Sequence, residues 1–227
     1  MATAEVQSRE LKEGAKLTRD EFMRLWEMNP RVKFAELIGG VVYMPSPLSV
    51  DHGDMDGSVG YWLSHYKAAT PGCACGHNTT TYLLEDVPQP DINLRILPEY
   101  RGKSWIDGKY LAGAPELLAE ICLSSASYDL HQKFDLYEAA GVQEYLAVLL
   151  NEKEIRWHVL ENGKYQRLQP DADGIWQSRV FPGLWLDGAA LLVNDTRRVF
   201  DCLLEGISSP AHQAFARQLA EKKTPQA

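Results

Sequence analysis

The sequence has few cysteines and no long apolar run. Its 227 residues include four cysteines, which are too few and too unevenly spaced for a disulfide framework, so we expect reduced thiols. No segment approaches the about 20 consecutive apolar residues that a membrane-spanning helix needs, and the first residues lack the apolar core of a signal peptide. These absences predict a protein without a membrane segment and with a cytoplasmic location.

The sequence also lacks an excess of basic residues. Acidic residues outnumber basic ones by 31 to 23, and the formal net charge is −8. Proteins that bind nucleic acid without sequence preference depend on a basic surface that releases counterions from phosphates. The chain as a whole has no such surface, although a local cluster with bound divalent cations can reverse the sign of the charge inside a cleft.

What is present is the composition of a soluble globular protein, with 45% hydrophobic and 24% charged residues. The length favours a single domain with modest extensions. Residues 1–16 are polar and contain no aromatic residue, which predicts a flexible N-terminal tail. The folded domain is predicted over residues 17–205, and residues 206–227 are predicted to form a weakly ordered C-terminal extension.

Local signals predict alternating helices and strands. Thr18 and Glu21 form a capping box at the start of a helix that ends before Pro30. Gly39-Gly40, between two β-rich runs, indicates a tight hairpin. The other predicted elements are helices at 51–69 and 196–205, a helix capped by Asp129 and closed by Gly141, strands at 75–84, 91–97, 116–122 and 142–150, a polar loop over 98–114, and a hairpin over 154–168. This order predicts an α/β fold with a mixed sheet flanked by helices.

Three side chains are candidates for chemistry. Glu120 lies in the nearly continuous apolar run PELLAEIC, where an ionised carboxylate needs a cation or several hydrogen-bond donors. Asp91 opens a neighbouring predicted strand, and Mg²⁺ held by the two carboxylates would meet that need. Taken separately, Asp91 also fits a strand-end residue that accepts from a turn amide. Lys133, on the next predicted helix, also fits a side chain that extends to solvent.

An ordered series of motifs resembles a known family. FAELIGGVVYMPSP, QPD, AEICLSSASYDLHQKFDLYEAAGVQEYL and ENGKYQRL follow one another in this chain. Together they resemble the bacterial Uma-two endonuclease-like family of the PD-(D/E)XK phosphodiesterase superfamily, over about residues 17–205. The resemblance implies a restriction-endonuclease-like fold, with a mixed β-sheet core flanked by helices and with added hairpins.

The same resemblance implies a catalytic site. Asp91 matches the acid of the PD half and Glu120 the acid of the (D/E)XK half, and the pair, with the Ile121 carbonyl, would hold Mg²⁺ or Mn²⁺. The superfamily places a lysine two residues after the second acid, where this chain has Cys122. In this family the lysine matches Lys133, which would orient the attacking water and share developing charge.

Two further residues match the family more distantly. Glu36 matches the glutamate of the opening hairpin, while the aspartate that usually follows it is Gly39 here. Glu36 would serve as an outer-sphere base or as a ligand of a second metal ion. His52 matches a histidine at the start of the next helix, and it would contact a phosphate oxygen or hold Glu36.

Three hypotheses follow for function. The leading one is a Mg²⁺-dependent endonuclease that hydrolyses phosphodiester bonds, with DNA as the expected nucleic-acid partner. The expected assembly is a two-fold homodimer, because two symmetric sites can cut both strands of a duplex. The second is a non-catalytic interaction protein that keeps the nuclease fold, supported by the acidic net charge, Gly39 and Cys122. The third is a zinc-stabilised binding module built on Cys73, Cys75 and His77, although the usual paired ligand spacing is absent.

Other residues could contact nucleic acid. The chain has one basic loop with Arg101, Lys103 and Lys109, which fits either a backbone contact or a solvated loop. Aromatic side chains stack on bases in nucleic-acid-binding proteins, but in alternating strands they more often pack in a core. The tryptophans to which both readings apply are Trp105, Trp157, Trp176 and Trp185.

Overall fold

The computed structural model describes residues 10–44, 47–123 and 131–223. The helices in this part of the chain are α1 (Arg19–Met28), α2 (Val50–Ala69), η1 (Pro98–Tyr100, a 3-10 helix), α3 (Gln132–Ala140), α4 (Gly188–Leu192), α5 (Thr196–Ile207) and α6 (Pro210–Lys222). None of these helices is long and apolar enough to cross a lipid bilayer.

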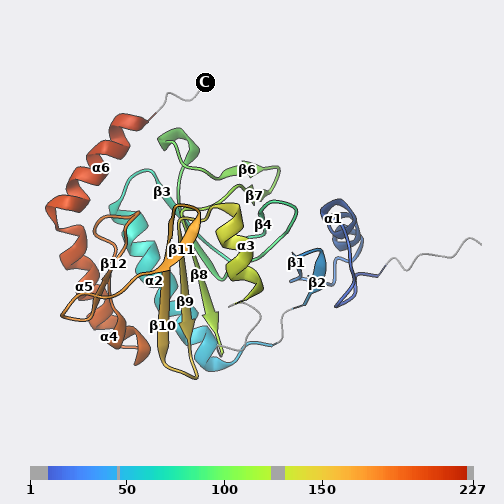
Figure 1. The fold of residues 1–227 in the computed structure, drawn as a ribbon, viewed down its shortest axis with the longest axis horizontal. Helices are drawn as coiled ribbons and strands as arrows, with labels where there is room; N and C mark the ends of the chain where they lie inside the picture. The colour runs from blue at the N-terminus through green and yellow to red at the C-terminus, as the bar shows by residue number, and fades with distance from the viewer. Residues whose placement is uncertain (1–9, 45–46, 124–130, 224–227) are drawn as a thin grey trace, which may run out of the picture.

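A six-stranded sheet forms the centre of the fold, and smaller sheets lie around it (Figure 1). The order of the large sheet is β11-β10-β9-β8-β5-β3. Its strands are β3 (Cys73–His77), β5 (Ile92–Ile96), β8 (Leu117–Cys122), β9 (Glu144–Leu149), β10 (Glu154–Glu161) and β11 (Lys164–Arg167). The smaller sheets contain β1 (Glu36–Ile38) with β2 (Val41–Tyr43), β12 (Ile175–Gln177) with β13 (Trp185–Asp187), and β4 (Thr81–Tyr82), β7 (Tyr110–Ala112) and β6 (Trp105–Asp107).

The large sheet is mixed. Strands β8 and β9 run parallel and are joined through α3, whereas the other neighbouring pairs are antiparallel. Parallel strands need a crossover connection, and a helix is the usual one. The predicted α/β fold with a mixed sheet and flanking helices is therefore confirmed.

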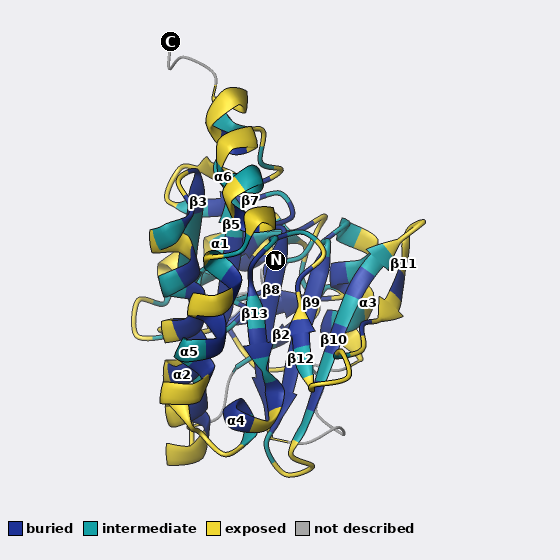
Figure 2. Ribbon diagram, turned by 90° about the vertical axis from the view of Figure 1, so that its left-hand side faces the viewer, coloured by how far each residue is buried: buried dark blue, intermediate teal, exposed yellow. Residues whose placement is uncertain are grey.

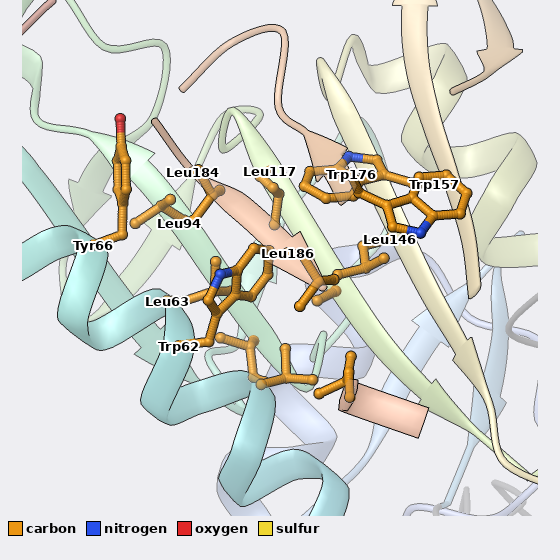
Figure 3. Close-up of a cluster of buried hydrophobic side chains, with 14 of the residues drawn as sticks. Trp62, Leu63, Tyr66, Leu94, Leu117, Leu146, Trp157, Trp176, Leu184 and Leu186 are labelled. Carbon is orange, nitrogen blue, oxygen red and sulfur yellow. The ribbon is translucent and has the colours of Figure 1, made fainter. Parts of the chain in front are cut away.

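One face of the sheet is covered by α2, α4, α5 and the β12–β13 ribbon, and Figure 3 shows side chains of this core. Trp62 of α2 meets Trp157 of β10 edge to face at 5.9 Å, and Trp176 of β12 stacks on Trp157 at 6.3 Å. Both Trp157 and Trp176 are buried, so these two tryptophans pack in the core and are not available to bases.

The other face of β8 and β9 is covered by α3. Strands β8 and β9 are buried along their whole length, as the dark strands in Figure 2 show. Side chains alternate along a strand, so Leu118, Glu120 and Cys122 point to one face and Leu117, Ala119 and Ile121 to the other. Leu118 and Cys122 pack with Leu136 and Tyr137 of α3. Glu120 therefore points into the layer between β8 and α3.

Three segments differ from the expectations that the sequence raises. The predicted polar loop over 98–114 contains η1 and the β6–β7 hairpin, because Leu111 of β7 pairs with Thr81 of β4, a partner distant in sequence. In the predicted weakly ordered C-terminal extension, α6 buries His212 and Leu219. In the predicted N-terminal tail, residue 11 is a buried leucine. The predicted helix cap at Asp129 lies outside the described residues.

His158 of β10 gives the fold a pH-dependent contribution to stability. Its ring packs edge to face on Phe134 at 5.0 Å. Burial, followed by the nearby charges of Arg167 and Arg156, lowers the pKa of His158 to about 4. In the unfolded chain the imidazole takes up a proton near pH 6.5. The stabilising contribution is thus complete above about pH 6.5 and is lost as the pH falls toward 4.

A His158→Phe variant should separate this effect from other titrations. Phenylalanine keeps the ring packing but does not titrate, so its melting temperature should fall less than that of the wild type between pH 7 and pH 4.5. Glu144, whose pKa burial raises to about 7, acts in the opposite direction but is present in both proteins. Equal falls in the two melting temperatures, measured by circular dichroism, would contradict the assignment.

Candidate active site

Lys133 lies between two carboxylates from distant parts of the chain. Its Nζ is 3.0 Å from Oε1 of Glu36 and 3.1 Å from Oε1 of Glu120. The three side chains come from α3, β1 and β8, and each is at most 9% exposed. Charged side chains are rarely buried unless they are paired, so this arrangement joins the hairpin to the sheet through an ion-pair network. Lys133 does not extend to solvent.

Further donors hold the two glutamates in place. The Tyr137 hydroxyl, one helical turn after Lys133, donates to Oε1 of Glu120 at 2.6 Å. Burial holds the pKa of Tyr137 well above its usual range, so the phenol keeps its proton for this bond. The backbone N–H of Gln89 donates to Oε1 of Glu36 at 2.6 Å. Glu36 thus occupies a fixed position as a partner of Lys133.

Asp91 directly precedes β5, the neighbour of the Glu120 strand. The antiparallel register pairs Ile92, the first residue of β5, with Ala119 of β8, so Asp91 and Glu120 lie at the same level along the two strands. The Oδ2 atom of Asp91 also accepts from the backbone N–H of Ile121 at 2.7 Å. The structure therefore brings the two predicted acids to the same end of the two central strands.

His52 contacts Asp91 from the first turn of α2. The two atoms that meet are Nε2 of His52 and Oδ2 of Asp91, 3.6 Å apart. The hydrogen bond to Asp91 raises the pKa of His52, and this effect outweighs the opposing effect of burial. The resemblance allowed His52 to hold Glu36, but the structure places it on Asp91, because α2 and the β1 hairpin approach the sheet from different sides.

The Ile121 carbonyl lies on the same edge of β8 as Asp91. The Cys122 carbonyl accepts from Leu150 on the β9 side, and successive carbonyls of a strand point to opposite sides. The Ile121 carbonyl must then point away from β9. The N–H of Ile121 points to the same side, since it donates to Asp91. This orientation is the one that the predicted oxygen ligand requires.

These oxygen atoms fit a hard divalent cation. Mg²⁺ binds to one or two carboxylates and keeps several water molecules, and Asp91, Glu120 and the Ile121 carbonyl offer that donor set. Asp91 is the most accessible of the acids, with 17% of its side chain exposed. Within residues 10–44, 47–123 and 131–223, no three His, Cys, Asp or Glu side chains are arranged to hold a metal ion, so a bound ion would depend on the carbonyl and on water for its other ligands.

The candidate zinc ligands do not form a site. Cys73 is buried in the core between the sheet and α2, and burial raises the pKa of its thiol to about 12. Zinc binds the thiolate, so this shift disfavours coordination. His77 instead faces Asp56 of α2, with 3.8 Å between Nδ1 and Oδ2. The described residues thus lend no support to a zinc-stabilised module.

The sequence arguments missed Tyr137 and Asp56. Tyr137 follows Lys133 by four residues and Asp56 follows His52 by four, the spacing at which helix side chains share a face. Burial, together with the charge of Asp91, raises the pKa of Asp56. The four-residue spacing was a usable signal for both residues. It identifies Tyr137 or Asp56, however, only once Lys133 or His52 is known to lie in the site.

Comparisons with known proteins identify a family and a similar fold. A family model named Uma2 and described as "Putative restriction endonuclease" matches residues 19–189. A crystal structure described as a putative nuclease belonging to DUF820 from Anabaena variabilis ATCC 29413 superposes with a TM-score of 0.62 and 16% sequence identity, covering 78% of this chain and 98% of that one. This likeness shows a shared nuclease-like fold. Among curated proteins, none shows a significant match.

Proposed function

Because the chain belongs to the Uma2 family of restriction-endonuclease-like proteins, we propose that it is a divalent-metal-dependent endonuclease that hydrolyses phosphodiester bonds in DNA. One observation carries the proposal: Lys133 Nζ lies 3.0 and 3.1 Å from two glutamates, and the Ile121 N–H, next to Glu120, donates to Asp91. A lysine beside the acid of the (D/E)XK half, with the acid of the PD half at the same end of the neighbouring strand, is the set that the PD-(D/E)XK resemblance implies.

The roles of the acids follow from their exposure and contacts. Asp91 and Glu120, with the Ile121 carbonyl, would hold Mg²⁺ or Mn²⁺. The Ile121 N–H fixes the carboxylate of Asp91, and Tyr137 fixes that of Glu120, so little ordering of ligands is needed on binding. The ion would supply an acidified water molecule and offset the charge that builds on the phosphate.

Lys133 contributes a fixed positive charge beside the reacting phosphate. Because the protein already holds its ammonium group between Glu36 and Glu120, Lys133 orients the attacking water without reorganisation during the reaction. Glu36 keeps Lys133 in place and can accept a proton from that water. His52 holds Asp91 through its 3.6 Å contact and contributes to orienting this ligand.

Metal addition and removal test the proposal directly. The purified protein should cleave plasmid, single-stranded or structured DNA in the presence of Mg²⁺ or Mn²⁺, and an excess of EDTA should abolish cleavage because the nucleophile and the charge compensation depend on the ion. Gel electrophoresis of end-labelled substrates gives the readout. Cleavage that persists in EDTA, or its absence with either metal on all three substrates, would contradict the proposal.

The alternative is a non-catalytic interaction protein with the same fold. It is favoured by Cys122, which stands where the superfamily has its lysine, and by the net charge of −8. Titration calorimetry separates the two, because the endonuclease should bind Mg²⁺ or Mn²⁺ at millimolar concentration and the interaction protein should not.

A further inference from the structure

A cavity of about 540 Å³ opens between α1, β4 and the β6–β7 hairpin. These elements lie at one side of the large sheet in Figure 1. Aromatic, aliphatic and charged side chains line the cavity. The lining residues that matter here are Arg19, Asp20, Tyr82, Leu84, Trp105 and Asp107.

Trp105 is exposed but held by the backbone beneath it. It is 53% exposed, whereas large aromatic side chains are usually buried. A Cβ atom at Gly113 would lie 2.5 Å from Cζ3 of Trp105, so the ring rests directly on the backbone of that glycine. Only glycine permits this approach, and Gly113 also has a φ of +77° that favours glycine. The fold therefore presents a preorganised indole ring to solvent.

The charged groups that line the cavity have both signs. The Arg19 guanidinium donates to the Leu84 carbonyl at 2.8 Å and lies 5.7 Å from the centre of the Tyr82 ring, so its position is fixed. Asp107 lies on the same face of β6 as Trp105, because the two are separated by one residue. A flat aromatic ligand that carries amino donors, attached to a phosphate, would match the indole, the carboxylates and the guanidinium at once.

A short stretch of backbone links the cavity lining to Asp91. The Thr81 N–H of β4, next to Tyr82, donates to the Pro88 carbonyl at 2.9 Å. Pro88 precedes Asp91 by three residues, which span at most about 10 Å. This link limits the separation of the cavity from Asp91, so a nucleic-acid strand with a phosphate at Asp91 would reach the cavity within a few nucleotides.

We infer that this cavity binds an unpaired nucleobase with an exocyclic amino group, from a single-stranded segment next to the scissile phosphate. Trp105 stacks on the base, as aromatic residues do in single-strand-binding proteins. Asp107 or Asp20 accepts from the amino group, as acidic side chains do from cytosine. Arg19 contacts the adjoining phosphate. The inference rests on the proposed endonuclease function. It adds that the protein prefers nucleic acid with unpaired bases next to the scissile phosphate.

Binding without cleavage tests the inference. Fluorescence anisotropy in EDTA should show that the wild type binds labelled oligo-dA or oligo-dC more tightly than oligo-dT, which lacks the amino group. Trp105→Ala should weaken binding of oligo-dA or oligo-dC about 10-fold, the scale of one stacked base. Ile106→Ser is the matched control, because Ile106 is 63% exposed and points to the opposite face of β6; its affinity should stay close to that of the wild type.

The outcomes separate this inference from the proposed function. Equal affinity of wild type and Trp105→Ala, equal losses in both variants, or no oligonucleotide binding by the wild type overturns the nucleobase site. Metal-dependent cleavage together with any of these results leaves the endonuclease intact. A loss confined to Trp105→Ala supports the site even where no cleavage is observed. Unchanged melting temperatures of both variants exclude unfolding as the cause.

Discussion

A Lys133→Met variant should lose about 3–5 kcal/mol of unfolding free energy, because removing one partner of a buried ion pair leaves uncompensated charge. Methionine replaces the apolar stem of lysine up to Cε and lacks only the ammonium group, so packing along the stem changes little. Glu36 and Glu120 each lie within 3.1 Å of the ammonium group, so both carboxylates would lose their positively charged partner. Urea denaturation at neutral pH, followed by circular dichroism, measures the loss.

Lys164→Met is the matched control for this prediction. Lys164 also pairs with a glutamate, Glu138, at 2.6 Å, but its side chain is 75% exposed. Exposed ion pairs contribute little to stability because water and salt screen them. The unfolding free energy of this variant should therefore be close to that of the wild type. Similar losses of unfolding free energy in the two variants would show that burial does not determine how much Lys133 contributes to stability. Adding Glu36→Gln to Lys133→Met should recover part of the loss, since one unpaired carboxylate is removed.

An Asp91→Asn variant should lose about 10³-fold in metal-dependent cleavage while keeping its fold, which corresponds to about 4 kcal/mol of transition-state stabilisation. Asparagine can still accept from the Ile121 N–H through its amide oxygen, and the side chain is partly exposed. The change removes the negative charge that would hold the cation. Single-turnover cleavage rates and Mg²⁺ affinity by calorimetry should both fall, and the melting temperature should change little.

Asp171→Asn gives the corresponding control. The carboxylate of Asp171 likewise accepts from backbone N–H groups, those of Asp173 and Ile175, but it belongs to the turn before β12. Cleavage by Asp171→Asn should match the wild type. If Asp91→Asn and Asp171→Asn cleave equally well, Asp91 is not a metal ligand and the proposed mechanism fails.

Much of the fold could be predicted because its signals are local. The capping box forms as the sequence predicts, with Glu21 and Thr18 each accepting from the backbone N–H of the other. The predicted hairpin turn has φ values of +58° at Gly39 and +71° at Gly40, the region that glycine favours. Such signals involve residues a few positions apart, so their energies do not depend on the rest of the structure.

The site could be predicted only in part. The apolar run around Glu120 identified a buried carboxylate, and the family resemblance identified Asp91 and Lys133. The contact of His52 with Asp91 and the pairing of Glu36 with Lys133 were not predicted. Both contacts depend on how α2 and the β1 hairpin pack on the sheet. Local sequence patterns do not determine this packing.

The sequence by itself determined the central strands, most helices and the burial of Glu120, because periodicity, caps and turn residues act over short distances. The tertiary structure alone decided the β4–β7 pairing and the packing of α6. These features arise from contacts between segments far apart in the chain. Their stability comes from area buried jointly by both segments, and neither segment shows that area by itself.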